Sequence, residues 1–222
     1  FVRYAVDEDY ISKDFTRNAK TYAAKESKSS DLKFLENDEL EKLIQSVKES
    51  DATTSHMILI AIYSGARYAE IAGLTKDDFN FENNTININK SWQANDQEFK
   101  ATKTKTSNRV IDMPHDIMEL AKSWTFGDRY AFESTTGLPP TNNAVNKQLR
   151  RYLEKNDSKI ITFHGLRHTH ASYLLSKDIA IQYVSERLGH ADVNITLSVY
   201  THLLAKKRSI ETQKALDELQ KL

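Results

Sequence analysis

The spacing of apolar residues predicts a chain made mostly of helices. From "FLENDELEKLIQSV" onward the apolar positions recur at helical intervals, and Asn37 or Asp38 is expected to cap the start of that helix. The next segment, "TSHMILIAIYSGARYAEIAGL", predicts two helices broken at Gly65, with Arg67 early in the second. Five segments beyond Pro114 also favour helix: "DIMELAKSW", "TNNAVNKQLRRYLEK", "TFHGLRHTHASYLLS", "IAIQYVSERLG" and "NITLSVYTHLLAKKR".

Two short segments alternate apolar and polar residues, which is the pattern of half-buried strands. "TININKSW" follows the turn-forming "NN", and "NRVIDMP" ends at Pro114. Between them lies the basic stretch "QANDQEFKATKTKTS", so we expect a small antiparallel sheet with a basic loop. The predicted fold class is therefore mainly α with a small antiparallel β-sheet (α+β).

Composition narrows the possible functions. The 222 residues, 39% of them hydrophobic, are enough for a real core, and 31 basic residues balance 31 acidic ones, so any basic patch must be local. The absence of cysteine excludes disulfides and thiolate chemistry and fits a reducing cytoplasm. The longest apolar run, "MILIAIY", is far shorter than the roughly 20 residues that span a bilayer. No leader sequence is visible, so we expect a fragment of a longer protein.

The segment "TFHGLRHTHASYLL" carries the first candidate site. His164 and Arg167 share a helix face, and Thr162 is placed to cap the N-terminus, where backbone N–H groups favour an anion such as phosphate. A metal site is the alternative, because His164, His168 and His170 form an HxxxHxH pattern. However, His170 lies about 200° around the helix from His168. No acidic residue is nearby, which disfavours the metal.

The loop "KATKTKTSNR" holds four basic residues and no acidic ones: Lys100, Lys103, Lys105 and Arg109. Such a loop is often only solvated, or follows a phosphate backbone. A lysine on a hairpin loop is also able to protonate a departing alkoxide. The loop thus offers either a DNA contact or a general acid.

The other basic residues, taken one at a time, are weaker indications of a functional site. Arg67 follows "SG", and Glu70 is one helical turn later, as in an ordinary surface pair. Two further basic clusters are "KQLRR" and "AKKRS", which contain Lys147, Arg150, Arg151, Lys206, Lys207 and Arg208.

Tyr200 lies ten residues after His190 in "GHADVNITLSVYTH". The apolar spacing around it favours a packing role by itself, with Val193, Leu197, Val199 and Leu203 as the apolar positions. Considered together, however, two arginines, a loop lysine, two histidines and a tyrosine are what in-line displacement at a phosphodiester requires without a metal.

Four blocks in order, "SGARYAEIAGLTKDDF", "TKTKTSNRVIDMP", "HGLRHTHAS" and "LGHADVNITLSVYTH", resemble the signature blocks of the tyrosine recombinase (phage-type integrase) family. The resemblance covers about residues 33 to 205. It implies the tyrosine recombinase catalytic-domain fold and a site-specific recombinase that integrates or excises a mobile element. Integration is favoured over chromosome-dimer resolution by the "TKTKTSNRVIDMP" block.

The resemblance also implies roles for individual residues. Glu70 would support Arg67, and Lys105 is an alternative to Lys103. The implied catalytic residues are Arg67, Lys103, His164, Arg167, His190 and Tyr200. The implied DNA-binding residues are Lys100, Arg109, Lys147, Arg150 and Arg151.

The mechanism that the resemblance implies has four parts. Arg67, Arg167 and His190 would hold the non-bridging oxygens of the scissile phosphate. Tyr200, a phenol with an ordinary pKa of ~10, would attack with His164 as the candidate base. Lys103 would protonate the leaving 5′-hydroxyl, which gives a 3′-phosphotyrosine without metal, ATP or cofactor.

The resemblance extends to domains and partners. Residues 1 to 30 would be the linker or tail of a missing N-terminal core-binding domain, 31–205 the catalytic domain and 206–222 a C-terminal tail helix exchanged with a neighbour. The expected partners are double-stranded DNA attachment sites, three further copies in a homo-tetramer on synapsed DNA, and an excisionase or host DNA-bending protein. We expect the fragment alone to be monomeric, with no membrane association, in the bacterial cytoplasm at the nucleoid.

Three alternatives compete with this interpretation. A type IB topoisomerase uses similar residues to relax DNA, although the "LGH" block and the small size favour an integrase. A non-catalytic helix-turn-helix regulator would explain "IAIQYVSERLGHADVNITLSVY" but not the arginines and the lysine loop. A metal-dependent nuclease is the third, and EDTA-insensitive activity would exclude it.

Overall fold

The computed structural model describes Val6 and residues 34–94, 97–101 and 107–221, and for residues 101, 202–211 and 213–215 it gives the backbone alone. The chain divides into two units, residues 1–32 and 33–222. All the elements discussed below belong to the second unit.

Helices dominate the described part of this unit, which confirms the predicted α+β class. The break at Gly65 lies where the sequence predicts it. The helices are α2 (Asn37–Lys48), α3 (Thr53–Ser64), α4 (Tyr68–Ala72), α5 (His115–Lys122), α6 (Asn142–Lys155), α7 (Phe163–Ser176), α8 (Ile181–Leu188) and α9 (Val193–Leu219), with a 3-10 turn at Lys76–Asp78.

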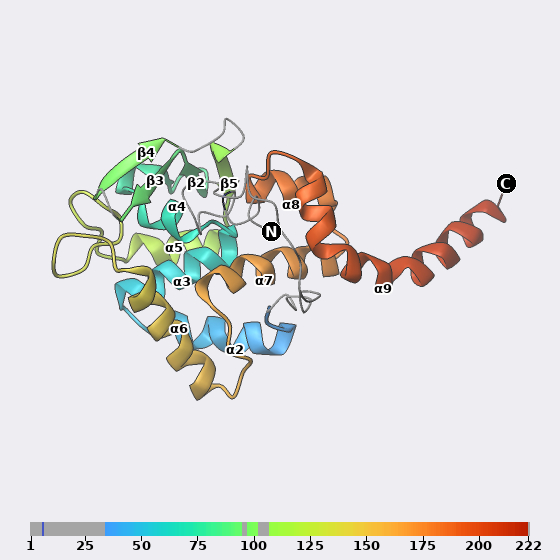
Figure 1. The fold of residues 1–222 in the computed structure, drawn as a ribbon, viewed down its shortest axis with the longest axis horizontal. Coiled ribbons are helices and arrows are strands. Elements are labelled where there is room, and N and C mark those ends of the chain that lie inside the picture. Colours follow the sequence, from blue (N-terminus) through green and yellow to red (C-terminus); the bar gives the residue numbers. More distant parts are fainter. Residues whose placement is uncertain (1–5, 7–33, 95–96, 102–106, 222) are drawn as a thin grey trace, which may run out of the picture. The chain divides into compact units, whose positions relative to one another are not determined.

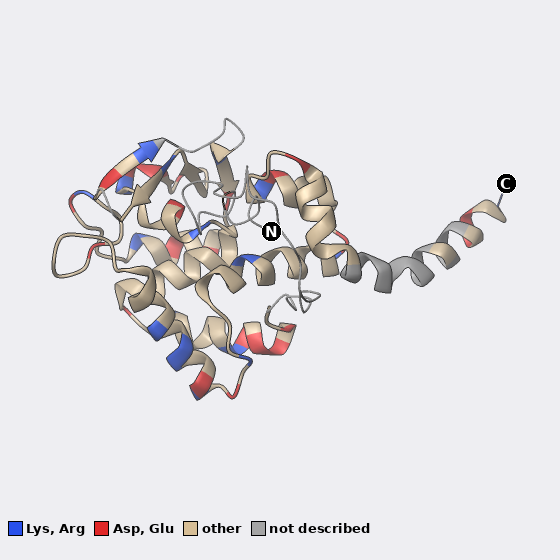
Figure 2. Ribbon diagram, in the orientation of Figure 1, with Lys and Arg blue, Asp and Glu red and all other residues tan. Residues whose placement is uncertain are grey.

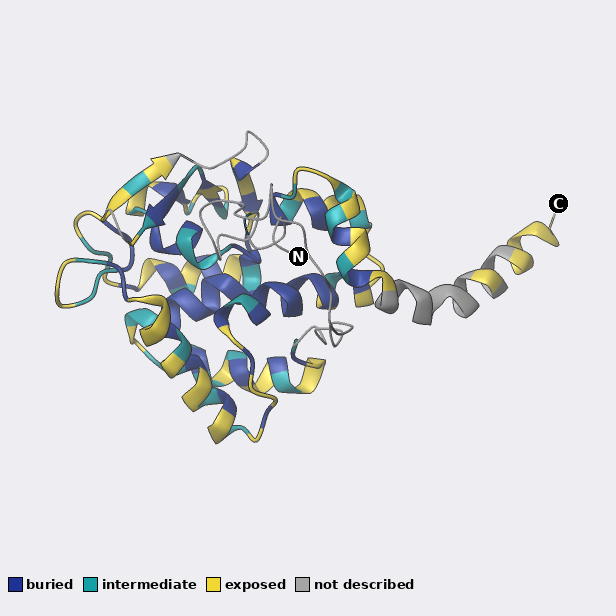
Figure 3. Cartoon of the chain, in the orientation of Figure 1, coloured by how far each residue is buried: buried dark blue, intermediate teal, exposed yellow. Residues whose placement is uncertain are grey.

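Helix α3 forms the centre of the larger hydrophobic core. The run from Met57 to Ile62 is buried on every face of the helix, which explains why its apolar residues are continuous instead of periodic. Helices α2, α6 and α7 pack against α3. The strands and α4 lie on the opposite side of α3 from α2 and α6 (Figure 1). In Figure 3, α3 and most of α7 are coloured as buried.

The strands form two small antiparallel sheets, where the sequence predicts one. Strands β1 (Phe79–Asn80), β2 (Thr85–Ile88) and β5 (Arg109–Asp112) pair in the order β1-β2-β5. Strands β3 (Lys90–Gln93) and β4 (Glu98–Ala101) pair with each other and, among the described residues, with no other strand. "TININKSW" is thus divided at Asn89 between the two sheets, and Asn89 donates a hydrogen bond from its amide to Asp78 at 2.9 Å.

A second, smaller cluster joins α7, α8 and α9. It contains Ala171, Leu175, Val184, Leu188 and Tyr200. Helix α8 ends at Gly189, which has a φ of 72°, and the chain then turns into α9. The residue predicted as a nucleophile therefore lies inside a packed junction of three helices.

Three local predictions about helices need correction. The N-cap of α2 is Glu36 instead of Asn37 or Asp38, and its backbone N–H donates to Glu39 Oε2 at 2.9 Å. Thr162 does occupy the N-cap of α7, but its side chain makes no capping hydrogen bond. In α9, Leu197 is 44% exposed and so does not belong to the buried face, whereas Val199 packs against the cluster that contains the buried Tyr200.

None of the helices in the described part of the chain combines the length and the apolar composition that crossing a bilayer requires.

Candidate active site

The break between α3 and α4 brings Arg67 to the start of a short helix. Gly65 adopts the left-handed conformation, with a φ of 65°, and ends α3. The Ala66 backbone N–H then donates to Ser64 Oγ at 3.1 Å. Arg67 is the N-cap of α4, and its backbone N–H donates to Glu70 Oε2 at 2.8 Å. A rigid turn thus fixes the position of the first predicted arginine.

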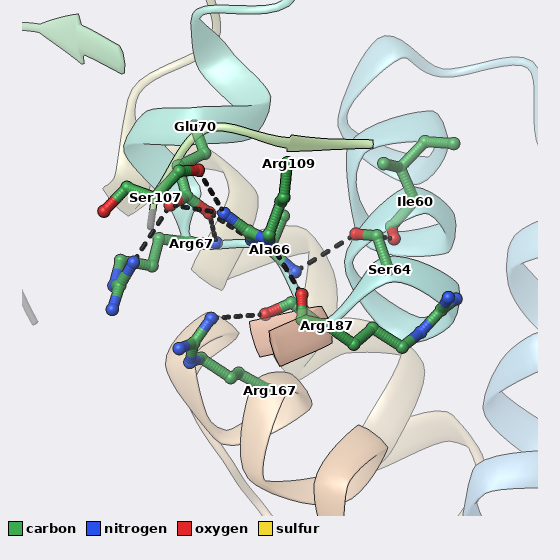
Figure 4. Close-up of polar contacts among 10 residues, drawn as sticks. Ile60, Ser64, Ala66, Arg67, Glu70, Ser107, Arg109, Arg167 and Arg187 are labelled. Atoms are coloured by element: carbon green, nitrogen blue, oxygen red, sulfur yellow. Dashed lines mark hydrogen bonds and ion pairs between the residues drawn. The ribbon is translucent and has the colours of Figure 1, made fainter. Parts of the chain in front are cut away.

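Glu70 is a buried carboxylate shared by two arginines (Figure 4). Arg67 Nη1 lies 2.9 Å from Glu70 Oε1, which confirms the contact expected between these two side chains. On the other side, Arg109 Nη2 lies 2.9 Å from Oε2, and Arg109 Nη1 donates to Oε1 at 3.2 Å. Bidentate pairing of this kind fixes the plane of the guanidinium. One acid therefore connects α4 to β5.

The charge of Glu70 depends on these cations. Burial acts to raise the pKa of the carboxyl, but the guanidiniums of Arg109 and Arg67 outweigh it and hold the pKa of Glu70 far below its usual range. Arg167 adds a smaller contribution in the same direction. Glu70 is consequently ionised at neutral pH, and the three arginines form one electrostatic unit with it.

Arg167 is held by the backbone of the same turn. Its Nη1 donates to the Gly65 carbonyl at 2.8 Å, and the residue is only 3% exposed. Both predicted arginines are thus positioned by one turn: Arg67 follows the turn in the chain, and Arg167 is hydrogen-bonded to its backbone. Two guanidiniums aimed from fixed positions are suited to hold an anion.

A second polar chain, between His170 and Arg187, supports this arrangement. His170 Nδ1 is 2.8 Å from the Ile62 carbonyl, so Nδ1 must carry the proton and Nε2 must accept the hydrogen bond from Arg187 Nε at 3.1 Å. Burial and the nearby Arg187 lower the pKa of His170 to about 3, which agrees with a neutral ring. The Arg187 carbonyl in turn accepts a hydrogen bond from Arg109 Nε at 2.7 Å. This chain ties α8 to the arginines, and nothing in the sequence pattern marks Arg187 for that role.

We expect Gly65→Ala to lower the free energy of unfolding by about 2–4 kcal/mol, from left-handed backbone strain and overpacking together. An added Cβ would lie 2.7 Å from His170 Cδ2 and 2.9 Å from Leu188 Cδ2. Urea unfolding followed by circular dichroism measures the loss.

Gly137→Ala is the matched control, because Gly137 has a φ of 73° and no atom lies within 4 Å of its added Cβ. It should show the backbone strain alone, about 1 kcal/mol. Equal losses in the two variants would mean that the core accommodates the methyl group at Gly65 without cost.

Two further predicted residues, His190 and Tyr200, occupy the α7–α8–α9 junction. His190 Nδ1 lies 2.7 Å from Thr196 Oγ1, which fixes the ring against the start of α9. Tyr200 is 1% exposed, and its Oη lies 2.9 Å from His168 Nδ1. The family resemblance does not include His168 among the implied catalytic residues. The contact joins residues 32 positions apart, and no local pattern indicates it.

His164 and His168 are neighbours on α7. Their rings meet edge to face at 4.7 Å between centroids and 82° between planes. His168 is bonded to Tyr200, and His170 to Ile62 and Arg187. The three histidines of the HxxxHxH pattern therefore have separate partners instead of converging on one point.

The predicted DNA-binding residues separate into two groups. Basic positions appear along α6 and at the end of β4 (Figure 2). Arg109, in contrast, is inside the ion-pair network, with 7% of its side chain exposed, so it supports Glu70 instead of extending from the surface. The exposed residues are Lys100, Lys147, Arg150 and Arg151.

Arg150 is paired within its own helix, since its Nε lies 2.7 Å from Glu154 Oε1. Lys103 and Lys105, the two candidates for the general acid, lie outside the described residues.

Comparison with known proteins identifies the family. The model of the phage integrase family matches residues 33–207, and the chain belongs to that family. It is 25% identical over 242 residues to a "Tyrosine recombinase XerC-like" protein of Caldanaerobacter subterraneus subsp. tengcongensis, covering 94% of this chain and 61% of that protein. It is 31% identical over 175 residues to the integrase of Staphylococcus phage L54a, covering 70% and 49% respectively. The chain thus spans about half to three-fifths of these relatives.

Solved structures agree on the fold. The Tn1549 transposon integrase bound to transposon right-end DNA superimposes with a TM-score of 0.72 at 19% identity, covering 86% of this chain and 68% of that one. The XerH site-specific recombinase, in a post-cleavage complex with palindromic difH substrate, gives a TM-score of 0.63 at 25% identity, covering 91% and 61%. The fold is that of the tyrosine recombinase catalytic domain.

Proposed function

We propose that the protein is a site-specific DNA recombinase that cuts and rejoins DNA through a 3′-phosphotyrosine on Tyr200. The observation that carries the proposal is the position of Tyr200, whose Oη is hydrogen-bonded to the residue directly after Arg167. Arg167 itself is bonded to the turn that presents Arg67. A nucleophile and two cations are therefore connected through one turn and one helix, as attack on a phosphodiester requires.

The proposed step is a transesterification. Arg67, Arg167 and His190 contact the non-bridging oxygens of the phosphate and stabilise its growing charge. Tyr200 Oη gives its proton to a base, for which the family resemblance offers His164, and forms a bond to phosphorus as the bond from phosphorus to the 5′-oxygen breaks. The departing oxygen takes a proton from Lys103, or from Lys105 in the alternative assignment.

The phosphotyrosine ester keeps the free energy of the broken bond. A 5′-hydroxyl from another strand is then able to reverse the step, which allows strand exchange without ATP or a metal. Homologues named as integrases and as a transposase of transposon Tn554 support a role in moving a mobile element.

Double-stranded DNA is the proposed partner. Exposed Lys100, Lys147 and Arg151 supply positive charge that neutralises phosphates, although the chain as a whole is neutral. The Tn1549 integrase is bound to transposon right-end DNA and XerH to its difH substrate, which supports this partner. The proposed assembly is a homo-tetramer on synapsed sites, with an excisionase or host DNA-bending protein as a further partner. The proposed location is the cytoplasm, at the nucleoid.

Covalent capture tests the proposed function. The protein is incubated in EDTA with nicked duplexes that tile the DNA on both sides of its own gene, and the mixture is separated under denaturing conditions. We expect a protein–DNA adduct whose modified peptide contains Tyr200. Firm, site-specific binding without an adduct would instead support the helix-turn-helix regulator. If the protein formed the adduct and relaxed supercoiled DNA but did not exchange strands between two DNA sites, the topoisomerase would be supported.

A further inference from the structure

The hydrogen bond between Tyr200 and His168 joins the second turn of α9 to the first turns of α7. Oη and Nδ1 are 2.9 Å apart, and the ring centroids are 6.0 Å apart with 58° between the planes. Tyr200 is 1% and His168 9% exposed. The contact is thus a direct one between two buried side chains.

A phenol needs a proton acceptor before it is able to attack phosphorus at neutral pH. With an ordinary pKa of ~10, only about one phenol in a thousand is ionised at pH 7. A base must lie within about 2.6–3.2 Å of the oxygen whose proton it takes. A neutral imidazole accepts at Nδ1 when its own proton is on Nε2. The distance between Oη and His168 Nδ1 meets this requirement.

The backbone of α7 keeps His168 next to Arg167, one of the two arginines proposed to hold the phosphate. His168 directly follows Arg167, whose guanidinium is fixed by the Gly65 carbonyl. Residues this close on one helix move together, so the base and the cation keep a constant separation. His164, the base suggested by family resemblance, packs against His168 edge to face and lies one turn earlier in α7.

We propose that His168 is the general base that takes the phenolic proton of Tyr200. This inference rests on the proposed recombinase function. As Oη bonds to phosphorus, the proton moves from Oη to His168 Nδ1, and the bond to the 5′-oxygen breaks. In the reverse step a 5′-hydroxyl gives its proton to the loop lysine and attacks phosphorus, and His168 returns its proton to Tyr200 as the bond from Oη to phosphorus breaks. His164 then packs beside the base instead of acting as the base itself.

Two substitutions separate a base from a positioning residue. His168→Asn keeps a group able to hydrogen-bond Tyr200 but unable to accept its proton, and His168→Ala removes both properties. The rate of adduct formation is measured for both variants and for the wild type on the nicked duplexes described above. His115, an exposed histidine on α5 with 72% of its side chain accessible, is changed to Asn as the control.

We expect both His168 variants to form the adduct about 100-fold or more slowly than wild type at pH 7, with DNA binding in a gel-shift assay unchanged. Between pH 7 and 9 their rates should rise about tenfold per unit as the phenolate fraction grows, while the wild-type rate stays nearly flat. The deficit therefore narrows with pH. His115→Asn should match the wild type throughout.

Several outcomes would overturn the assignment. A wild-type rate in His168→Asn but not in His168→Ala would show that the hydrogen bond only positions Tyr200. Faster cleavage in either variant would show that the contact with His168 restrains Tyr200. A loss of rate that does not change with pH would show that His168 has a structural role. If the wild type itself formed no adduct, the recombinase proposal would fail together with this one, whereas an equal rate in all proteins would remove His168 alone.

Discussion

Tyr200→Phe is expected to abolish the covalent adduct, with a loss of about 10⁴-fold or more, as the removal of an essential nucleophile does. The ring stays packed among α7, α8 and α9, because only the hydroxyl is lost. Loss of its hydrogen bond to His168 should lower the free energy of unfolding by about 1 kcal/mol. Denaturing gels measure the adduct, and urea unfolding together with gel shift measures the fold and the DNA binding.

Tyr130→Phe is the matched control. Tyr130 is also fully buried, but it lies in the larger core, and its Oη has no hydrogen-bond partner among the residues that the structure describes. This variant should form the adduct at the wild-type rate. An adduct in Tyr200→Phe would move the nucleophile to another residue and leave Tyr200 as a packing side chain.

Glu70→Ala is expected to lower the free energy of unfolding by about 3–5 kcal/mol at pH 7, because it leaves the two buried guanidiniums of Arg67 and Arg109 without their shared anion. We expect strand cleavage to fall as well, since Arg67 loses the partner that orients it. Glu154→Ala is the control, because Glu154 pairs with Arg150 on the exposed face of α6 and its loss should cost less than about 1 kcal/mol.

The dependence of this effect on pH follows from the direction of the pKa shift of Glu70. Its pKa in the folded chain is lower than in the unfolded chain, where it is about 4.3. The ion pairs therefore stabilise the fold fully above that value, and the stabilisation is lost as the pH falls below it. The difference between wild type and Glu70→Ala should narrow in urea unfolding below about pH 4. A constant difference would assign the loss to packing instead of charge.

Local patterns in the sequence were enough for much of the fold. Gly65 ends α3 because only a residue without Cβ accepts its left-handed backbone beside His170, and a glycine between two apolar runs indicates such a break. The pairing of β2 with β5 likewise follows from two alternating segments. The Arg67–Glu70 contact was predictable because residues three apart on a helix are neighbours.

Contacts between distant segments were not predictable in this way. Arg109 looked like part of a basic surface loop, yet Glu70, 39 positions earlier, binds it inside the domain. His168 contacts Tyr200, and Arg187 contacts His170, across the packed helices α7, α8 and α9. In α9 the buried face is marked by Thr196 and Tyr200, since Thr196 faces His190 and Tyr200 faces His168. On this helix, polar contacts thus lie on the same buried face as the apolar packing of Tyr200 and Val199.

The arginine cluster makes folding and anion binding a single linked equilibrium. Arg67, Arg109 and Arg167 act on one carboxylate, so positive charge remains in excess in a buried place, although the whole chain is neutral. Like charges gathered around one carboxylate repel one another. An anion that binds only the folded state offsets that repulsion and shifts the equilibrium toward the native form. For the phosphodiester proposed as the ligand, this linkage would make DNA binding stabilise the fold.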